Sequence, residues 1–453
     1  MADEEIQRLV DKARAAQKVI ESYDQEKTDR IVRMFAKVVF DNAEPLAKMA
    51  VEETGMGVFE HKVKKNQGKS RIIWHGLKGK KSMGVLRYIE EEGIVEVAKP
   101  MGVVGAVTPC TNPIVTPMCN AMFAVKGKNV IIVAPHPRAK KCAKRLKELY
   151  DAELLKMGVP TDIFQVIEEP TIELTGELMK AVDVVIATGG MGMVKAAYSS
   201  GKPSFGVGAG NVQCLIDKGY DMSVCVPKIV EGRIFDNGII CSCEQTAIAH
   251  EDDFETMLAE FEKNGAYIVR DKDELDRLRE TLSPGGKLNK DAVGAPVAKI
   301  ADMAGIKVPE GCKLLVVVPE KYGEEEQFAR EKMCPVIAAY KYHTWPEAVS
   351  IALSNLEVEG KGHSASIHSD NRMHVEYAME VLPVSRIVVN QICATMNGGS
   401  FFNGLNPTTT LGCGSWGNNS ISENLTFKHL INISRIAYVK PGAVQPSDDE
   451  IWG

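Results

Sequence analysis

The segment Gly102-Val-Val-Gly-Ala-Val-Thr-Pro109 has the pattern of a short buried β-strand that ends in a turn. Two further apolar runs of this kind follow, Asn129–Pro135 and Asp183–Thr188, with helical sequence between them. Short apolar strands that alternate with helices predict a parallel sheet, with a nucleotide bound at the carboxyl ends of the strands. The sequence therefore predicts an α/β fold.

Two α/β domains are expected along the chain. Residues 3–23 and 26–54 have helical periodicity. Near residue 230 the composition changes, and the second half has helices and strands of its own before a loop-rich end. A chain of 453 residues is also too long for one ordinary core. We therefore expect a nucleotide-binding domain over residues 1–230, excluding 84–98, and a second domain over residues 231–425.

Residues 84–98 and 430–453 are expected to lie apart from both cores. The first segment has a Glu-Glu-Glu-Gly turn between two strand-like runs, and the second includes the strand-like run Ile431–Val439. Excursions of this kind often pair with another subunit. We therefore expect a small oligomerisation β-flap and a homodimer.

Composition excludes several kinds of partner. The net charge of −6 gives no electrostatic reason to expect nucleic-acid binding. No stretch approaches the roughly 20 apolar residues of a membrane span, and the acidic N-terminus lacks the features of a signal peptide. Eleven cysteines without framework spacing indicate reduced thiols in the cytoplasm. Cys241 and Cys243 have no second pair at zinc-ligand spacing, so we expect no metal site.

Cys241 is placed where a nucleophile could be. It follows an Asn-Gly turn and an apolar pair in Phe235-Asp-Asn-Gly-Ile-Ile-Cys-Ser-Cys-Glu-Gln245, and polar residues come after it. A nucleophilic cysteine needs a site that lowers the thiol pKa or offers a base. Cys243 would face the opposite way in an extended segment. A buried structural cysteine is the alternative, and the spacing alone does not choose between the two thiols.

Three turns that directly follow predicted strands are candidates for cofactor contact. They are Thr108-Pro-Cys-Thr-Asn-Pro113, Pro135-His-Pro-Arg138 and Thr188-Gly-Gly-Met-Gly192. Gly412–Gly417 is the one literal G-x-G-x-x-G, but it lacks the strand and helix of a dinucleotide fingerprint, so we expect an active-site turn there. Arg138 and Lys140 begin the helix after the second strand, where a cation suits a ribose 2′-phosphate; surface charge is the alternative.

Together these segments resemble the coenzyme A-acylating branch of the aldehyde dehydrogenase superfamily. The matching segments span nearly the whole chain in family order: Thr108–Pro113, Ala134–Arg138, Ala187–Gly190, Phe205–Asn211, Asp236–Cys241, Glu331–Pro335, Gly362–Ser364 and Leu411–Gly417. The resemblance implies an aldehyde dehydrogenase-like α/β fold, with a Rossmann-type cofactor domain, an α/β catalytic domain and an oligomerisation β-flap.

The resemblance also implies roles for individual residues. Cys241, rather than Cys243, becomes the nucleophile, and Asn112 with the Cys241 N–H group holds the developing oxyanion. On the strength of Arg138 and Lys140, the cofactor is expected to be NADP, with NAD as the alternative. Its expected contacts are Thr108, Pro109, His136, Arg138, Lys140, Thr188, Gly189, Gly190, Gly208 and Glu331. His363 lies in a glycine-containing loop. Our hypothesis is that it accepts the proton of the coenzyme A thiol; the alternative is that it is an ordinary loop histidine without a catalytic role.

Two departures from the hydrolytic members of the family concern the site. Where those members carry Glu-Leu-Gly-Gly, this chain has Phe205-Gly-Val-Gly-Ala-Gly210, which has no carboxylate to activate water. A thiol acceptor is therefore implied, with coenzyme A as co-substrate. Hydrolytic members also have Pro-x-Asn-x-Pro, whereas Pro109-Cys-Thr-Asn-Pro113 displaces Asn112 by one residue.

The substrates implied by the resemblance are succinyl-CoA and succinate semialdehyde. The segments that carry this finer likeness are Val389–Gln391, Gly398–Phe401, Asn406–Leu411 and the C-terminal Glu-Ile-Trp-Gly. Acetaldehyde or another short aldehyde is the alternative within the class, and a non-catalytic binding protein on a dehydrogenase fold is the alternative from another class. The 390–419 loops contain no arginine for the substrate carboxylate, so Asn390, Gln391 and Ser400 are the candidates there.

Overall fold

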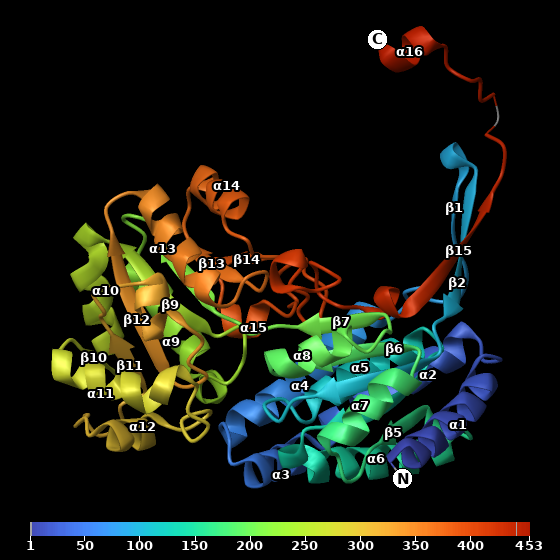
Figure 1. Cartoon of the computed structure of the whole chain (residues 1–453), viewed down its shortest axis with the longest axis horizontal. Helices are drawn as coiled ribbons and strands as arrows, with labels where there is room; N and C mark the ends of the chain where they lie inside the picture. The colour runs from blue at the N-terminus through green and yellow to red at the C-terminus, as the bar shows by residue number, and fades with distance from the viewer. Residues whose placement is uncertain (1, 441) are drawn as a thin grey trace.

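Three sheets organise the chain, of which the computed structural model describes residues 2–440 and 442–453. Figure 1 shows a body with two parts side by side, each built around one large sheet and its helices. A narrow three-stranded sheet projects from this body, and the C-terminal helix α16 (Asp448–Trp452) lies beyond its tip.

The five-stranded sheet has the strand order of a Rossmann-type nucleotide-binding unit. All its strands are parallel. In spatial order they are β5 (Phe164–Val166), β4 (Val130–Pro135), β3 (Val103–Thr108), β6 (Val184–Thr188) and β7 (Ser204–Val207). Their order places the first strand of the unit in the middle, as in dinucleotide-binding folds. β3 and β4 are buried along their whole length, which confirms the strands predicted from their continuous apolar runs.

Helices cover both faces of this sheet. α1 packs against α7, and α2 packs against α5. The residues predicted as one helix over 26–54 form two, because Asn42 leaves the helical conformation and Pro45 in the next turn lacks an N–H group. The helices are α1 (Ala2–Ile20), α2 (Gln25–Asp41), α3 (Ala43–Thr54), α4 (Phe59–Leu77), α5 (Val115–Lys126), α6 (Lys140–Lys156), α7 (Ile172–Ala181) and α8 (Met191–Tyr198).

The second sheet has seven parallel strands. In spatial order they are β10 (Ala266–Val269), β11 (Leu314–Val317), β12 (Val336–Tyr342), β9 (Glu244–His250), β8 (Val212–Ile216), β13 (Ala365–His368) and β14 (Ile387–Val389). β8 belongs to this sheet although it precedes residue 231, so the sheet begins earlier than the expected boundary near residue 230. The reason is that β8 is as apolar and buried as the strands before it, so composition does not mark the change.

Separate apolar cores lie on the two faces of the seven-stranded sheet. α9 and α10 pack together, and α13 packs against β8. The helices are α9 (Met222–Ile234), α10 (Glu251–Lys263), α11 (Lys272–Leu282), α12 (Val297–Ala304), α13 (Trp345–Val358), α14 (Arg372–Val381) and α15 (Cys393–Met396). In the part of the chain that the structure describes, no helix has the length and apolar character needed to cross a bilayer.

The segments that were expected to lie apart from both cores form the third sheet. β1 (Gly84–Ile89), β2 (Ile94–Pro100) and β15 (Ile431–Ala437) are antiparallel, with β2 in the middle. The two segments, more than 300 residues apart in the chain, therefore pair with each other. We call this sheet the flap.

Candidate active site

Two cavities meet at Cys241. The larger cavity, of about 500 Å³, lies at the carboxyl ends of β3, β4 and β6. The smaller cavity, of about 350 Å³, is lined by α4 and by the loops that follow α15. Among the described residues, Asn112, Cys241 and Thr409 line both cavities. A thiol at this junction can reach groups that are bound on either side.

The larger cavity brings together most of the predicted cofactor contacts. The residues that line it include Thr108, Pro109, His136, Arg138, Thr188, Gly189, Gly190, Gly208 and Glu331. The carboxyl ends of neighbouring parallel strands meet at one edge, which explains why turns far apart in sequence converge here. Lys140 is the exception, because its ammonium group pairs with Glu169 at the surface, outside the cavity lining.

The groups at the ends of β6 and β7 fit a dinucleotide. Thr188 Oγ1 is buried and has no hydrogen-bond partner within the described chain. Gly190 is the N-cap residue of α8 and provides no side-chain cap. The N–H groups at the start of the helix, other than that of Met193, which donates to the Gly190 carbonyl oxygen, therefore remain available for a pyrophosphate. A Cβ atom added at Gly189 or Gly190 would meet no heavy atom within 4 Å, so the backbone there borders open space.

Two cationic side chains border the larger cavity near the end of β4. Arg138 donates a hydrogen bond to the Thr54 carbonyl oxygen at 2.6 Å, which fixes one side of its guanidinium group. Lys290 reaches the same cavity from the loop before α12. Burial lowers the pKa of His136, and the charges of Arg138 and Lys290 lower it further. Sequence reasoning missed Lys290, since it lies in a loop between two helices, away from the strand ends that mark the other cofactor contacts.

The structure distinguishes the two neighbouring cysteines. Cys243 is fully buried, 4.0 Å from the Phe235 carbonyl oxygen, and lines neither cavity. Burial raises the pKa of the Cys241 thiol well above its usual range, and Glu331 and the thiols of Cys413 and Cys243 add to this. Arg386 acts in the opposite direction. In this state Cys241 is a neutral thiol, so its reaction requires that a proton be removed.

Lysines of α4 give the smaller cavity a cationic wall. Lys64, Lys65 and Lys69 line it, opposite the loop that contains Ser400 and Phe401. Lys69 Nζ donates to the carbonyl oxygens of Gly398 and Thr408, both at 3.2 Å. Burial lowers the pKa of Lys69 to about 8, although a charge on Cys241 would raise it. Sequence reasoning missed these lysines because α4 itself was not predicted.

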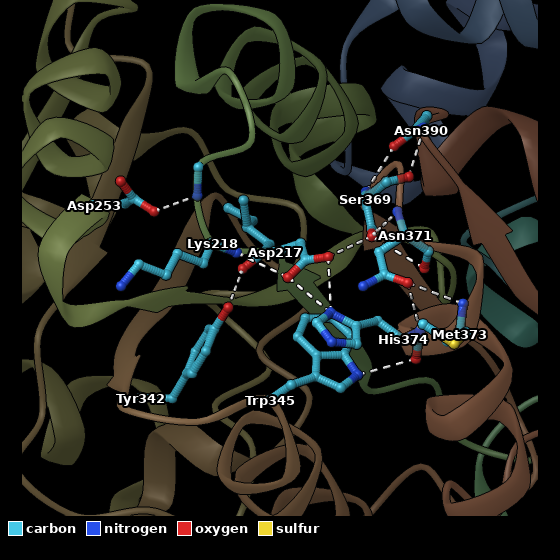
Figure 2. A network of polar contacts seen from close by, with 12 residues as sticks. Asp217, Lys218, Asp253, Tyr342, Trp345, Ser369, Asn371, Met373, His374 and Asn390 are labelled. Atoms are coloured by element: carbon cyan, nitrogen blue, oxygen red, sulfur yellow. Dashed lines mark hydrogen bonds and ion pairs between the residues drawn. The ribbon is translucent and has the colours of Figure 1, made fainter.

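Of the three loop residues expected to bind the substrate carboxylate, one lies at the smaller cavity and two do not. Ser400 lines the smaller cavity, whereas Asn390 and Gln391 do not. The Asn390 side chain instead bonds the backbone of Ser369, which joins Asp217 in the polar network of Figure 2. The Gln391 side chain donates to the Val389 carbonyl oxygen and accepts a hydrogen bond from Asn403 Nδ2. These two amides therefore have structural partners away from Cys241.

His363 lies outside the linings of both cavities. Its ring is fully buried, and neither ring nitrogen has a hydrogen-bond partner within the described chain. Burial lowers the pKa of His363 to about 3, and the charge of Arg386 contributes. An imidazole with this pKa is a weak proton acceptor, so these observations argue against a role as base for a thiol.

Known proteins match both the sequence and the fold. Residues 1–281 match the model of the aldehyde dehydrogenase family. The chain is 55% identical over 448 residues to succinate-semialdehyde dehydrogenase (acetylating) of Clostridium kluyveri, and the match covers 99% of each chain. An acetylating aldehyde dehydrogenase of Geobacillus thermoglucosidasius superposes with a TM-score of 0.94 at 37% identity, over 99% of this chain and 98% of that one.

A third match bears on the chemistry of the site. A propionaldehyde dehydrogenase of Rhodopseudomonas palustris, solved with CoA bound and a cysteine acylated, has a TM-score of 0.86 at 27% identity, over 96% of this chain and 97% of that one. Sequence identity, coverage and fold agree across the three proteins. The chain therefore belongs to the aldehyde dehydrogenase family and is an oxidoreductase.

Proposed function

We propose that this protein interconverts succinyl-CoA and succinate semialdehyde through a thioester on Cys241, with NADP(H) as cofactor and coenzyme A as co-substrate. The observation that carries the proposal is the position of Cys241 between a nucleotide-type cavity and a cavity that is lined by the half-buried Lys69. The 55% identity to succinate-semialdehyde dehydrogenase (acetylating) supports the same substrate pair.

In the reductive direction, the Cys241 thiol gives up its proton as its sulfur attacks the thioester carbonyl of succinyl-CoA. Coenzyme A leaves as a thiol, whose sulfur takes up one proton in place of the one that Cys241 lost. Asn112 and the Cys241 N–H group hold the negative charge that develops on the carbonyl oxygen, an effect typically worth about 3 kcal/mol per donor. NADPH, when bound in the larger cavity, supplies the hydride that reduces the acyl group. The carbon–sulfur bond to Cys241 then breaks, the Cys241 sulfur takes up a proton from solvent, and the aldehyde is released.

In the oxidative direction a thiol, rather than water, completes the reaction. The turn Phe205–Gly210 has no carboxylate that could activate water beside the thioester. The acylated cysteine and bound CoA of the Rhodopseudomonas palustris protein support the same acceptor here. Coenzyme A therefore takes the succinyl group from Cys241.

Lys69 is the residue that we assign to the substrate carboxylate. Two of its three ammonium hydrogens point to carbonyl oxygens of the loops that face α4, and the third is free to bind a ligand in the smaller cavity. Lys69 is half-buried. Its ammonium group gains more from an anionic partner than a fully exposed one would, because water screens it less. Acetyl-CoA has no group that could make this contact.

NADP(H) is preferred over NAD(H) in this proposal. Arg138 and Lys290 border the larger cavity beside the end of β4, where the adenosine ribose of a Rossmann-type unit lies. A guanidinium and an ammonium group together suit a 2′-phosphate. The remaining guanidinium donors of Arg138 are held in place by its bond to Thr54.

The proposal extends to the organisation of the chain. The part built on the five-stranded sheet holds the cofactor, and the part built on the seven-stranded sheet carries the nucleophile. We assign homodimer formation in the cytoplasm to this enzyme. The dimer is supported by exposed apolar side chains on the flap and just beyond it, namely Tyr88, Ile436, Tyr438 and Val439. The cytoplasm is supported by the eleven cysteines, all of which are free thiols, as is usual in a reducing compartment.

A comparison of succinyl-CoA with acetyl-CoA tests the function. We expect the wild-type kcat/KM to be higher for succinyl-CoA than for acetyl-CoA. Lys69→Met should lower kcat/KM for succinyl-CoA by about 10- to 150-fold, because it removes one charge-assisted hydrogen bond to the substrate carboxylate. The activity of Lys69→Met with acetyl-CoA serves as the internal control. Equal kcat/KM for the two substrates in the wild-type enzyme would overturn the substrate assignment. Reduction of succinyl-CoA by Cys241→Ala would overturn the mechanism.

A further inference from the structure

The chain adopts an unusual backbone conformation just before Cys241. Asp236 has φ 53° and ψ 36°, Asn237 has φ 55° and ψ 36°, and Gly238 has φ 70°. Three consecutive residues are thus left-handed, which L-residues other than glycine rarely adopt. Such a conformation persists only where the surrounding structure holds it, and it is found most often at functional sites.

A buried charge cluster holds this conformation. The Asp236 carboxylate accepts hydrogen bonds from the Val58 N–H group at 2.8 Å, Lys62 Nζ at 3.0 Å and Lys65 Nζ at 2.6 Å. The side chain of Asp236 is fully buried, and those of Lys62 and Lys65 are 3% and 8% exposed. Burial alone would raise the pKa of Asp236, but the Lys65 and Lys62 ammonium groups hold it below its usual range.

The backbone around Asp236 is fixed as well. Its N–H group donates to His61 Nδ1 at 2.9 Å, and the His61 ring stacks on Phe235 with ring centroids 4.8 Å apart. Asn237 Nδ2 donates to the Gly294 carbonyl oxygen at 2.9 Å. The segment before the nucleophile is therefore attached on one side to the start of α4 and on the other to the loop before α12.

Stability alone is a poor reason for such a cluster. Moving charges out of water is costly, and well-packed apolar residues often stabilise a fold as well as a buried ion pair does. Asp236 precedes Cys241 by only five residues, and α4 continues from Lys62 and Lys65 to Lys69 on the wall of the smaller cavity. The cluster thus connects the backbone of the nucleophile to the helix that borders the substrate.

We propose that Asp236, held by Lys62 and Lys65, is a positioning residue that fixes Cys241 at the junction of the two cavities. This inference rests on the proposed function in one respect, that Cys241 is the nucleophile. Asp236 does not touch the substrate. It acts through the left-handed turn, whose geometry decides where the Cys241 sulfur and N–H group lie.

Asp236→Asn tests the proposal. Asparagine has nearly the same size, tolerates the left-handed conformation and can still accept the Val58 hydrogen bond, so mainly the charge is removed. We expect kcat with succinyl-CoA to fall about 100-fold, the cost of a misplacement of about 1 Å, while KM for succinyl-CoA and NADPH changes little.

Asp29→Asn is the matched control. Lys126 Nζ contacts Asp29 Oδ1 at 2.6 Å, the Lys126 side chain is fully buried, and neither residue lines the two cavities. This variant also removes the carboxylate that pairs with a buried lysine, so it should lower the melting temperature but keep kcat. A kcat for Asp236→Asn within a few-fold of the wild type, or an equal loss of kcat in Asp29→Asn, would overturn the proposal.

Alkylation of Cys241 separates this inference from the proposed substrate. The rate of Cys241 modification by iodoacetamide, followed by mass spectrometry of its peptide, needs no substrate. It should change in Asp236→Asn and stay constant in Asp29→Asn, even if succinyl-CoA is not the substrate. If Asp236→Asn does not fold, Lys62→Met removes one partner of the same carboxylate and should lower kcat and alter the alkylation rate. Unchanged values in a folded Lys62→Met would then count against the proposal.

Discussion

Gly210→Ala should disable the enzyme through the backbone of Cys241. A Cβ atom added at Gly210 would lie 1.8 Å from the Cys241 carbonyl oxygen and 2.6 Å from its carbonyl carbon. Contacts below 3.0 Å are essentially never seen for Cβ atoms, so the oxygen must move by about 1.2 Å, a displacement of the size that lowers rates about 100-fold. Gly210 and Cys241 lie in the loops that lead into the neighbouring strands β8 and β9. Because the atoms that the added Cβ would meet belong to the backbone of Cys241, no flexible side chain can relieve the overlap.

The assay combines steady-state rates with a binding measurement. We expect kcat with succinyl-CoA to fall about 100-fold. Overpacking should lower the free energy of unfolding by about 1–3 kcal/mol. NADPH binding should stay unchanged, because Gly210 does not line the larger cavity. Gly176→Ala is the control, since a Cβ atom there, within α7, would meet nothing within 4 Å. If Gly210→Ala keeps wild-type kcat and melting temperature, the close approach of these two backbones is not what places Cys241.

Three further outcomes follow from the charges around the site. Arg138→Ala and Lys290→Ala should each weaken NADPH binding by about 10- to 150-fold and leave NADH binding nearly unchanged, because each removes a charge-assisted contact to the 2′-phosphate. Fluorescence titrations that show equal losses of affinity for the two cofactors would refute this assignment. His363→Asn should leave the rate of acyl transfer to coenzyme A within a few-fold of the wild type, since the pKa of His363 lies near 3; a large drop in a single-turnover measurement would restore His363 as the base. Burial raises the pKa of Glu331 to about 8, with a contribution from Glu359, and an ionised carboxylate accepts hydrogen bonds from ribose hydroxyl groups more strongly than a protonated one. NADPH affinity should therefore increase as the pH rises through 8, and a Glu331→Gln variant should lose this dependence.

The fold of the cofactor part could be predicted because its signals are local. β4 is apolar along its whole length and β3 and β6 are apolar up to their last residue, a threonine. Each strand is followed by a turn with glycine or proline. Once the strands are known, the topology of a parallel sheet brings those turns to one edge. Most of the predicted cofactor contacts line the larger cavity for this reason.

The parts that could not be predicted depend on contacts between distant segments. α4 carries lysine, asparagine and serine on its buried face, so it lacks the apolar period that identifies a helix in a sequence. Lys62 and Lys65 are buried only because Asp236, more than 170 residues later, supplies the opposite charge. Lys290 likewise joins the larger cavity through the folding of a loop whose local sequence gives no sign of it.

The arrangement of α4 links substrate selection to nucleophile geometry. Lys62, Lys65 and Lys69 are spaced by three and four residues, so they share one face of the helix. The first two hold Asp236, while Lys69 lines the smaller cavity. Because one rigid helix carries all three, it sets the distance between the Lys69 ammonium group and the Cys241 sulfur. In the function proposed above, a four-carbon acyl group with a terminal carboxylate spans that distance when its carbonyl carbon is at the thiol, so the same helix would select both chain length and charge.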